Sequence, residues 1–220
     1  MDATRRRLIL STLALSAGSA LPALGQESRN APQTTRAFLT HEEYRFLEAA
    51  TARLIPGDRD DPGALEAGIP RFIDLQLAGF YGRADRWYMD GPWAEGTPQQ
   101  GYQLKQTPAQ LYRQAIARID AYCRTQYDGQ AFAALSAEQQ DQFLHDMEAG
   151  KIELPDVPAK MFFQLLWQNT QEGFLADPMY GGNRHFAGWK LIGFPGPRYN
   201  YVEEITQYGI PYPLPPVGKG

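Results

Sequence analysis

The chain has 220 residues, of which 43% are apolar, 12% aromatic and 21% charged, and its net charge is -4 at pH 7. This length and apolar fraction suit one well-packed domain. The acidic balance argues against a nucleic-acid-binding face, because phosphate contacts require clustered Lys and Arg side chains. Nucleic acid is therefore not an expected partner.

The first 25 residues have the layout of an export signal. The pair Arg5 and Arg6 precedes an apolar run that starts at Leu8 and holds no charged residue before Glu27. A charged start, a modest apolar stretch and small residues near a cleavage site are typical of a secretory signal. Arg5 and Arg6 resemble the twin-arginine pair, which marks a route used by folded cargo. We expect residues 1–25 to be a twin-arginine-type signal peptide.

The alternative for this segment is a membrane anchor or an amphipathic leader. The run is short for a bilayer span of roughly 20 residues, and Pro22 interrupts it. Cleavage is expected after Gly25, with Ala20 as a second candidate position. Residues 26–38 are then a polar linker, and residues 39–220 a single domain.

Cys123 is the only cysteine. An exported chain with one cysteine has no internal disulfide. The residue is either a reactive or intermolecular thiol, or a small buried residue on a helix, and the second interpretation is favoured. One cysteine is too few for a c-type haem attachment motif.

The first two predicted helices precede residue 81. Residues 40–43 fit a capping box, in which Thr40 and Glu43 satisfy first-turn amides. Pro56-Gly57 ends this helix, whose apolar stripe is Tyr44, Leu47, Ala50 and Leu54. An acidic loop with Asp58, Asp60 and Asp61 follows, and a solvated turn is favoured over a calcium site because the ligand spacing of an EF-hand is missing. The second helix has Pro70 in its first turn and the stripe Ile69, Phe72, Ile73, Leu77 and Phe80.

Three further helices are predicted in the second half. The third opens at Thr107-Pro108, the fourth at Ser136 and ends near Gly150, and the fifth runs from Pro155 towards Phe174. Alternating patterns of strand length are missing from the sequence. The predicted fold class is mainly α, a single helical domain of about five helices with long irregular segments rich in Gly, Pro and aromatic residues.

Two irregular segments stand out, residues 81–106 and the stretch from Gly173 onward. Both combine turn-forming residues with large aromatic side chains. Such segments are either a packed lid over the helices or a surface for a partner, because large side chains bury much area at little entropic cost. The sequence leaves these two interpretations open.

Recognisable catalytic motifs are missing. The sequence has no dinucleotide-binding, phosphate-binding or nucleophile-elbow motif, and His41, His145 and His185 lie in no metal-binding spacing. His41 and His145 are predicted to be surface residues on helices. His185, helped by Asp177 or Arg184, is a conceivable general base. The favoured interpretation is that Asn183, Arg184 and His185 form hydrogen bonds with the backbone of a turn. Asp177-Pro178 is interpreted in the same way, as a turn or cap.

Several short motifs together resemble the gluconate 2-dehydrogenase subunit 3 family. The most specific is Tyr180-Gly181-Gly182-Asn183-Arg184, followed closely by residues 188–196. His185, directly after this motif, departs from the acidic or other polar residue expected there. Supporting matches span most of the domain in family order: residues 54–56, 67–74, 100–103 and 172–178.

The resemblance implies a non-catalytic small subunit of a periplasmic complex that is membrane-associated through its partners. A large FAD-containing subunit of the glucose–methanol–choline type is expected to oxidise gluconate or a related sugar, and a multihaem cytochrome c subunit to carry electrons. The resemblance places FAD and haem c in these partners and no cofactor or metal in this chain. The small subunit of this heterotrimer is expected to stabilise the flavoprotein and to escort it through the twin-arginine translocase.

This hypothesis requires an aromatic interface. The candidate interface residues are Trp87, Tyr88, Trp93, Tyr102, Phe174, Tyr180, Asn183, Arg184, Trp189, Phe194 and Tyr199. The alternatives are an autonomous periplasmic enzyme or a free-standing binding protein that uses residues 180–184.

Overall fold

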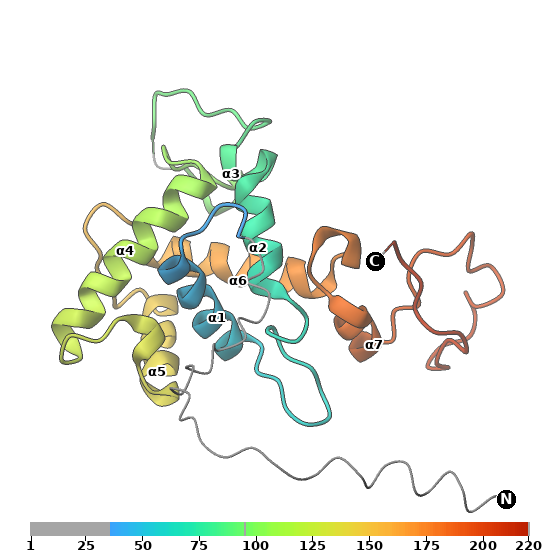
Figure 1. Cartoon of the computed structure of the whole chain (residues 1–220). Coiled ribbons are helices and arrows are strands. Elements are labelled where there is room, and N and C mark those ends of the chain that lie inside the picture. The colour runs from blue at the N-terminus through green and yellow to red at the C-terminus, as the bar shows by residue number, and fades with distance from the viewer. Residues whose placement is uncertain (1–35, 95, 220) are drawn as a thin grey trace, which may run out of the picture. The chain divides into compact units, whose positions relative to one another are not determined.

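Helices make up the core of the domain in this computed structural model, which describes residues 36–94 and 96–219. Within these residues there are seven α-helices and no β-strand. Figure 1 shows how the helices are arranged. Their bounds are α1 His41–Leu54, α2 Ile69–Ala78, α3 Phe80–Arg83, α4 Pro108–Gln126, α5 Ala137–Glu148, α6 Ala159–Leu175 and α7 Ala187–Ile192. Short 3-10 turns include η4 Pro178–Tyr180 and η5 Arg184–Phe186. The predicted mainly α fold is confirmed.

Three helices begin where the sequence predicts, and each begins with a capping box, of which the sequence predicts the one at Thr40. Thr40, Thr107 and Ser136 each accept a hydrogen bond from the third helical amide, and the side chain at that position bonds back to the cap. Each box satisfies two amides that a helix start otherwise leaves unpaired. Local sequence therefore determines where α1, α4 and α5 begin.

The second helix ends earlier than predicted. Gly79 adopts an extended conformation and ends α2 at Ala78, so Phe80 begins the separate four-residue helix α3. The Phe80 side chain is exposed rather than part of the buried stripe, and the Arg83 guanidinium lies 5.3 Å from its ring centre. The prediction that Phe80 continues the core face of α2 is wrong, because the break at Gly79 turns the chain.

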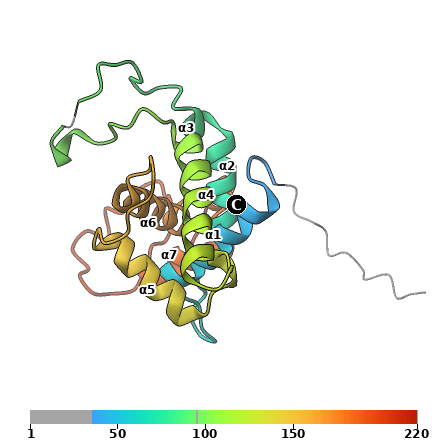
Figure 2. The ribbon, with the colours of Figure 1, turned by 90° about the vertical axis from the view of Figure 1, so that its left-hand side faces the viewer.

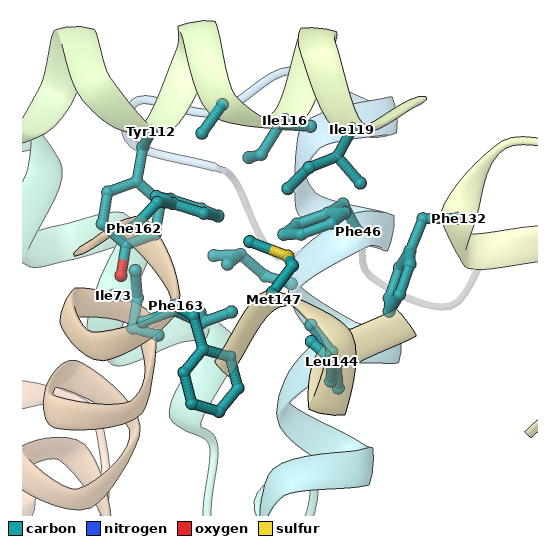
Figure 3. Close-up of a cluster of buried hydrophobic side chains, with 14 of the residues drawn as sticks. Phe46, Ile73, Tyr112, Ile116, Ile119, Phe132, Leu144, Met147, Phe162 and Phe163 are labelled. Atoms are coloured by element: carbon teal, nitrogen blue, oxygen red, sulfur yellow. The ribbon is translucent and has the colours of Figure 1, made fainter. Parts of the chain in front are cut away.

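A single cluster of buried side chains joins the helices (Figure 3). Phe46 of α1 packs against Phe132 at 5.0 Å between ring centres, and Tyr112 of α4 packs edge-on against Phe162 of α6 at 5.2 Å. Helix α4 contacts both α2 and α6, and lies between them in Figure 2. Burial of large side chains, at about 2 kcal/mol each, is the main stabilising contribution to such a core.

The cysteine, the acidic loop and two of the histidines lie where the sequence predicts. Cys123 is fully buried on α4, which confirms the favoured interpretation, and burial raises the pKa of its thiol to about 12. Asp58 accepts hydrogen bonds from the amides of Asp60 and Asp61, both at 2.8 Å, which confirms an exposed turn. His41 and His145 are exposed on α1 and α5, as predicted.

A buried carboxylate fixes the start of the described chain. Asp74 of α2 accepts hydrogen bonds from the backbone amides of Ala37, Phe38 and Leu39 at 2.6 to 2.9 Å. The Arg71 guanidinium adds an ion pair to the same carboxylate, at 3.1 Å. The segment before α1 is thereby tied to α2.

The predicted signal peptide, with Arg5 and Arg6, lies outside the described residues, as does most of the predicted linker. The boundaries 1–25, 26–38 and 39–220 therefore stay predictions. None of the helices in residues 36–94 and 96–219 has the length and apolar character needed to cross a bilayer.

Candidate partner interface

The glycine-rich motif folds into a tight corner between α6 and α7. Asp177 caps η4 by accepting a hydrogen bond from the Met179 amide at 3.0 Å, with Pro178 at the first position. This confirms Asp177-Pro178 as a cap. Gly181 then turns the chain with a left-handed φ of 94° and leads into η5 and α7.

Asn183 is the buried centre of this corner. Its Nδ2 donates to the carbonyl oxygen of Ala176 at 2.7 Å, and its Oδ1 accepts from the amide of Gly188 at 2.8 Å. The residue is fully buried and has a left-handed backbone, which Asn tolerates better than most residues. Asn183 thus joins the end of α6 to the start of α7, as the turn interpretation predicts.

Glycines let the corner approach α6 closely. A Cβ at Gly182 would clash with the Gly173 carbonyl oxygen, and one at Gly188 with the Phe174 carbonyl oxygen. Both contacts are with backbone, which cannot move aside as a side-chain tip can. The motif therefore requires glycine for packing at these two positions.

Trp189 locks α7 onto α6. Its indole Nε1 donates to the Leu175 carbonyl oxygen at 2.7 Å, and its ring stacks on Phe186 and meets Phe194 edge-on. Three predicted interface residues, Phe174, Asn183 and Trp189, are buried within this chain. They build the corner and are not available to a partner, so for them the interface prediction is corrected.

Arg184 and His185 lie on the outer side of the corner. The Arg184 amide donates to the Ala67 carbonyl oxygen at 3.0 Å, and its side chain covers Gly68 at the start of α2. Both side chains are exposed. Among the described residues, no hydrogen bond or ion pair joins His185 to Asp177 or Arg184, so the geometry of a supported general base is not assembled there.

Large exposed apolar side chains gather on the elements around this corner and beyond it. Tyr180 is half exposed, Phe194 is 39% exposed and Tyr199 is fully exposed. Sequence reasoning missed the neighbours that share this character. These are Leu175, Met179, Leu191, Ile192, Val202, Ile205, Tyr208, Ile210, Leu214 and Val217.

Residues 197–217, here called the C-terminal arm, form a loop with a fixed base. The Val217 amide donates to the Pro195 carbonyl oxygen at 3.2 Å, and Arg198 donates to the Pro215 carbonyl oxygen at 2.6 Å. The Lys219 amide returns to the Asp177 carboxylate at 3.2 Å. Figure 1 shows the arm extending beyond α7 before it returns.

The other irregular segment, residues 84–107, is also held at its base by aromatic side chains. The Trp87 ring packs edge-on against Tyr81 at 5.6 Å and in a tilted arrangement against Tyr102 at 5.1 Å between ring centres. The Tyr81 hydroxyl donates a hydrogen bond to the side-chain oxygen of Asn169 in α6. Burial raises the pKa of this Tyr81 hydroxyl. Tyr88 is 82% exposed and Trp93 is half-buried. Figures 1 and 2 show this loop leaving α3 and returning to the start of α4.

A shallow pocket lies where α1, α5 and α6 meet, and the sequence gives no signal for it. Its volume is about 280 Å³, and the ion pair between Arg53 and Asp141 lies at its edge at 2.6 Å. Its lining residues are Arg53, Leu54, Asp141, Leu144, His145, Glu148, Phe163 and Trp167. In the part of the chain that the structure describes, no three His, Cys, Asp or Glu side chains are placed to hold a metal ion.

Comparison with known proteins gives one family match. A family model described as gluconate 2-dehydrogenase subunit 3 matches residues 41–196, which include α1 to α7. Neither a curated protein nor a solved structure matches the chain. The matched region contains the glycine-rich corner, whose glycines, asparagine and tryptophan all have defined packing roles. The chain belongs to the gluconate 2-dehydrogenase subunit 3 family.

Proposed function

We propose that this chain is the non-catalytic small subunit of a periplasmic, FAD-dependent gluconate or sugar dehydrogenase complex. In this role it binds the flavoprotein subunit, stabilises it and escorts it through the twin-arginine route. The family itself is one of dehydrogenase complex subunits. The finer role rests on the surface of the chain.

The distribution of exposed apolar side chains carries the proposal. Of the seventeen large apolar residues exposed among the described residues, thirteen lie after residue 174. Scattered single residues of this kind are normal on a monomer, whereas a concentration in one part of the chain is typical of an interaction surface. A partner that covers α7 and the C-terminal arm would remove these side chains from water.

The corner geometry supports a positioning role for the family motif. Asn183 bonds the backbone of Ala176, just after α6, and of Gly188 in α7, and Trp189 bonds the last residue of α6. Gly182 and Gly188 allow close packing. These residues hold α7, with the exposed Leu191 and Ile192, at a fixed place on the domain. A rigid support for exposed apolar residues suits binding, because less entropy is lost on association.

We assign the cofactors of the complex to its other subunits. Covalent haem c requires a pair of cysteines next to a histidine, and this chain has the single buried Cys123. FAD belongs in the large subunit of the glucose–methanol–choline type, and haem c in a multihaem cytochrome subunit that connects the complex to the membrane. The exposed side chains of Trp87 and Tyr88 offer a second, smaller surface for one of these partners.

Export provides the test. The chain is co-expressed with its flavoprotein, Arg5 and Arg6 are both replaced by Lys, and periplasmic dehydrogenase activity is measured. Both proteins should disappear from the periplasm, whereas the matched Arg7→Lys variant, which keeps the pair, should export normally. Undiminished flavoprotein export with Arg5 and Arg6 replaced would refute the escort role.

A further inference from the structure

Part of the C-terminal arm carries the start and stop signals of a helix. Asn200 accepts a hydrogen bond from the Val202 amide at 3.3 Å, as a residue at a helix start does. Glu203 stands at the third helical position, where it complements both the cap and the positive end of the helix. Gly209 has a left-handed φ of 71° and Pro211 follows, the usual order at a helix end.

The structure nevertheless shows a series of turns over residues 200–208. The Glu204 amide donates a hydrogen bond to the Tyr201 carbonyl oxygen at 3.2 Å, and the Gln207 amide donates one to the Glu204 carbonyl oxygen at 2.9 Å. In each bond the donor follows the acceptor by three residues. Such bonds are those of single turns rather than of a continuous α-helix. An isolated helix of this length is marginal in water, so helix-forming sequence alone does not complete it. Residues 200–208 are called the recognition segment below.

The apolar side chains of the recognition segment face solvent. Val202, Ile205 and Tyr208 are 70%, 71% and 88% exposed. In an α-helix their spacing would place them along one side, with Glu204 at the edge of that side beside Tyr208 and Glu203 on the opposite side. The segment therefore has the pattern of an amphipathic helix whose apolar face is uncovered.

The start of the segment is anchored on its own chain. The Tyr201 ring packs edge-on against Tyr212 at 5.8 Å, and its hydroxyl donates to the Gly196 carbonyl oxygen. Arg198 lies over the Tyr212 ring at 5.3 Å. The arm thus presents the segment from a fixed base.

We propose that the recognition segment completes an α-helix when it docks into an apolar groove on the flavoprotein subunit. Val202, Ile205 and Tyr208 would fill the groove, as in other helix-in-groove complexes. A basic side chain at the groove's rim would face Glu204, at the edge of the apolar side. The inference rests on the proposed function, and it concerns residues that follow the family-matched region 41–196.

Charge distinguishes this partner from two others. Between Tyr199 and Val217 the sequence has two Glu and no Lys or Arg. Helices that lie on membranes carry Lys and Arg on their polar face, which favours a protein partner over an anionic lipid surface. A symmetric contact through the same side of a second copy would bring together two segments that each carry two negative charges, and like charges repel.

Affinity for the purified flavoprotein, measured by titration calorimetry, tests the inference. The variant with Val202→Ser, Ile205→Ser and Tyr208→Ser should keep the melting temperature of the unmodified chain, because these side chains are exposed, and should raise Kd at least tenfold. A matched pair at an exposed polar position, Thr206→Ala and Thr206→Gly, changes helix propensity alone. The Gly variant should bind about fivefold more weakly than the Ala variant.

The binding results separate the inference from the proposed function. Equal binding by the triple-serine variant and the unmodified chain would overturn the inference and leave the proposed function intact. Equal binding by the two Thr206 variants would overturn the helical docking mode. Failure of the unmodified chain to bind the flavoprotein would overturn the proposed function and the inference together. Binding to phosphatidylglycerol vesicles, or dimerisation of the chain alone, that the triple-serine variant loses would overturn the choice of partner.

Discussion

The side-chain amide of Asn183 donates a hydrogen bond of 2.7 Å to the carbonyl oxygen of Ala176, across the corner between α6 and α7. The same side chain accepts from the Gly188 amide. One residue thereby satisfies two buried backbone groups at the end of one helix and the start of another. Loss of this residue should loosen the surface that α7 carries.

Asn183→Ala should lower the free energy of unfolding by about 2–4 kcal/mol. The substitution leaves the Ala176 carbonyl and the Gly188 amide buried without partners, and it places Ala in a left-handed conformation. Urea denaturation followed by circular dichroism measures the change. The neighbouring His185→Ala, whose side chain is exposed, serves as the control and should cost less than about 1 kcal/mol. Equal stability of the two variants would contradict the role given to Asn183.

Gly188→Ala should cost more than about 2 kcal/mol, because the added Cβ clashes with the Phe174 backbone. Gly129→Ala is a matched control. Its φ of 81° disfavours Ala, but nothing lies within 4 Å of the added atom, so its cost should stay near about 1 kcal/mol. Thermal unfolding of both variants gives the comparison. A smaller loss for Gly188→Ala than for Gly129→Ala would show that the corner is not tightly packed.

Asp74→Asn should destabilise the domain by about 2–4 kcal/mol. The buried carboxylate accepts four hydrogen bonds, whereas an amide must turn its NH2 group towards donors on one side. Hydrogen exchange should show faster exchange of the Phe38 and Leu39 amides. Asp128→Asn, at an exposed left-handed position, is the control and should be nearly neutral. Unchanged protection of these amides would exclude Asp74 as the anchor.

Cys123 should resist alkylation in the folded chain. Its pKa is raised by burial to about 12, so the reactive thiolate is scarce at pH 8 and increases only as the pH rises towards that value. Iodoacetamide should react at least about a hundredfold more slowly than with the unfolded chain. The variant Cys123→Ala with Thr125→Cys moves the thiol to an exposed position on the same helix and should react fast. Rapid labelling of native Cys123 would show that α4 opens readily.

The helices that begin with capping boxes were predictable from sequence, because the signals at Thr40, Thr107 and Ser136 act within four residues. The short helices α3 and α7 were not predicted. Four and six residues are too few to show a helical period, and Trp189 holds α7 in place through a contact with α6 that only tertiary structure reveals.

The aromatic interface was predictable only in part. Composition identified the segments from residues 81 and 173 as unusual, but an aromatic residue that packs a corner and one that faces solvent look the same in sequence. Phe174 and Trp189 are buried, whereas Tyr88 and Tyr199 are exposed. The spacing of Val202, Ile205 and Tyr208, with Asn200 and Gly209 at the ends, was the signal that could have identified the apolar residues of the recognition segment.

The most direct test of the subunit role is to mix the purified chain with its purified flavoprotein and to measure mass and dehydrogenase activity across a size-exclusion column. We expect a one-to-one complex that carries the flavin and the activity, a higher melting temperature for the bound flavoprotein, and no sugar oxidation by this chain alone. Separate elution of the two proteins, with gluconate oxidation by this chain and a flavin bound to it, would contradict the non-catalytic subunit role.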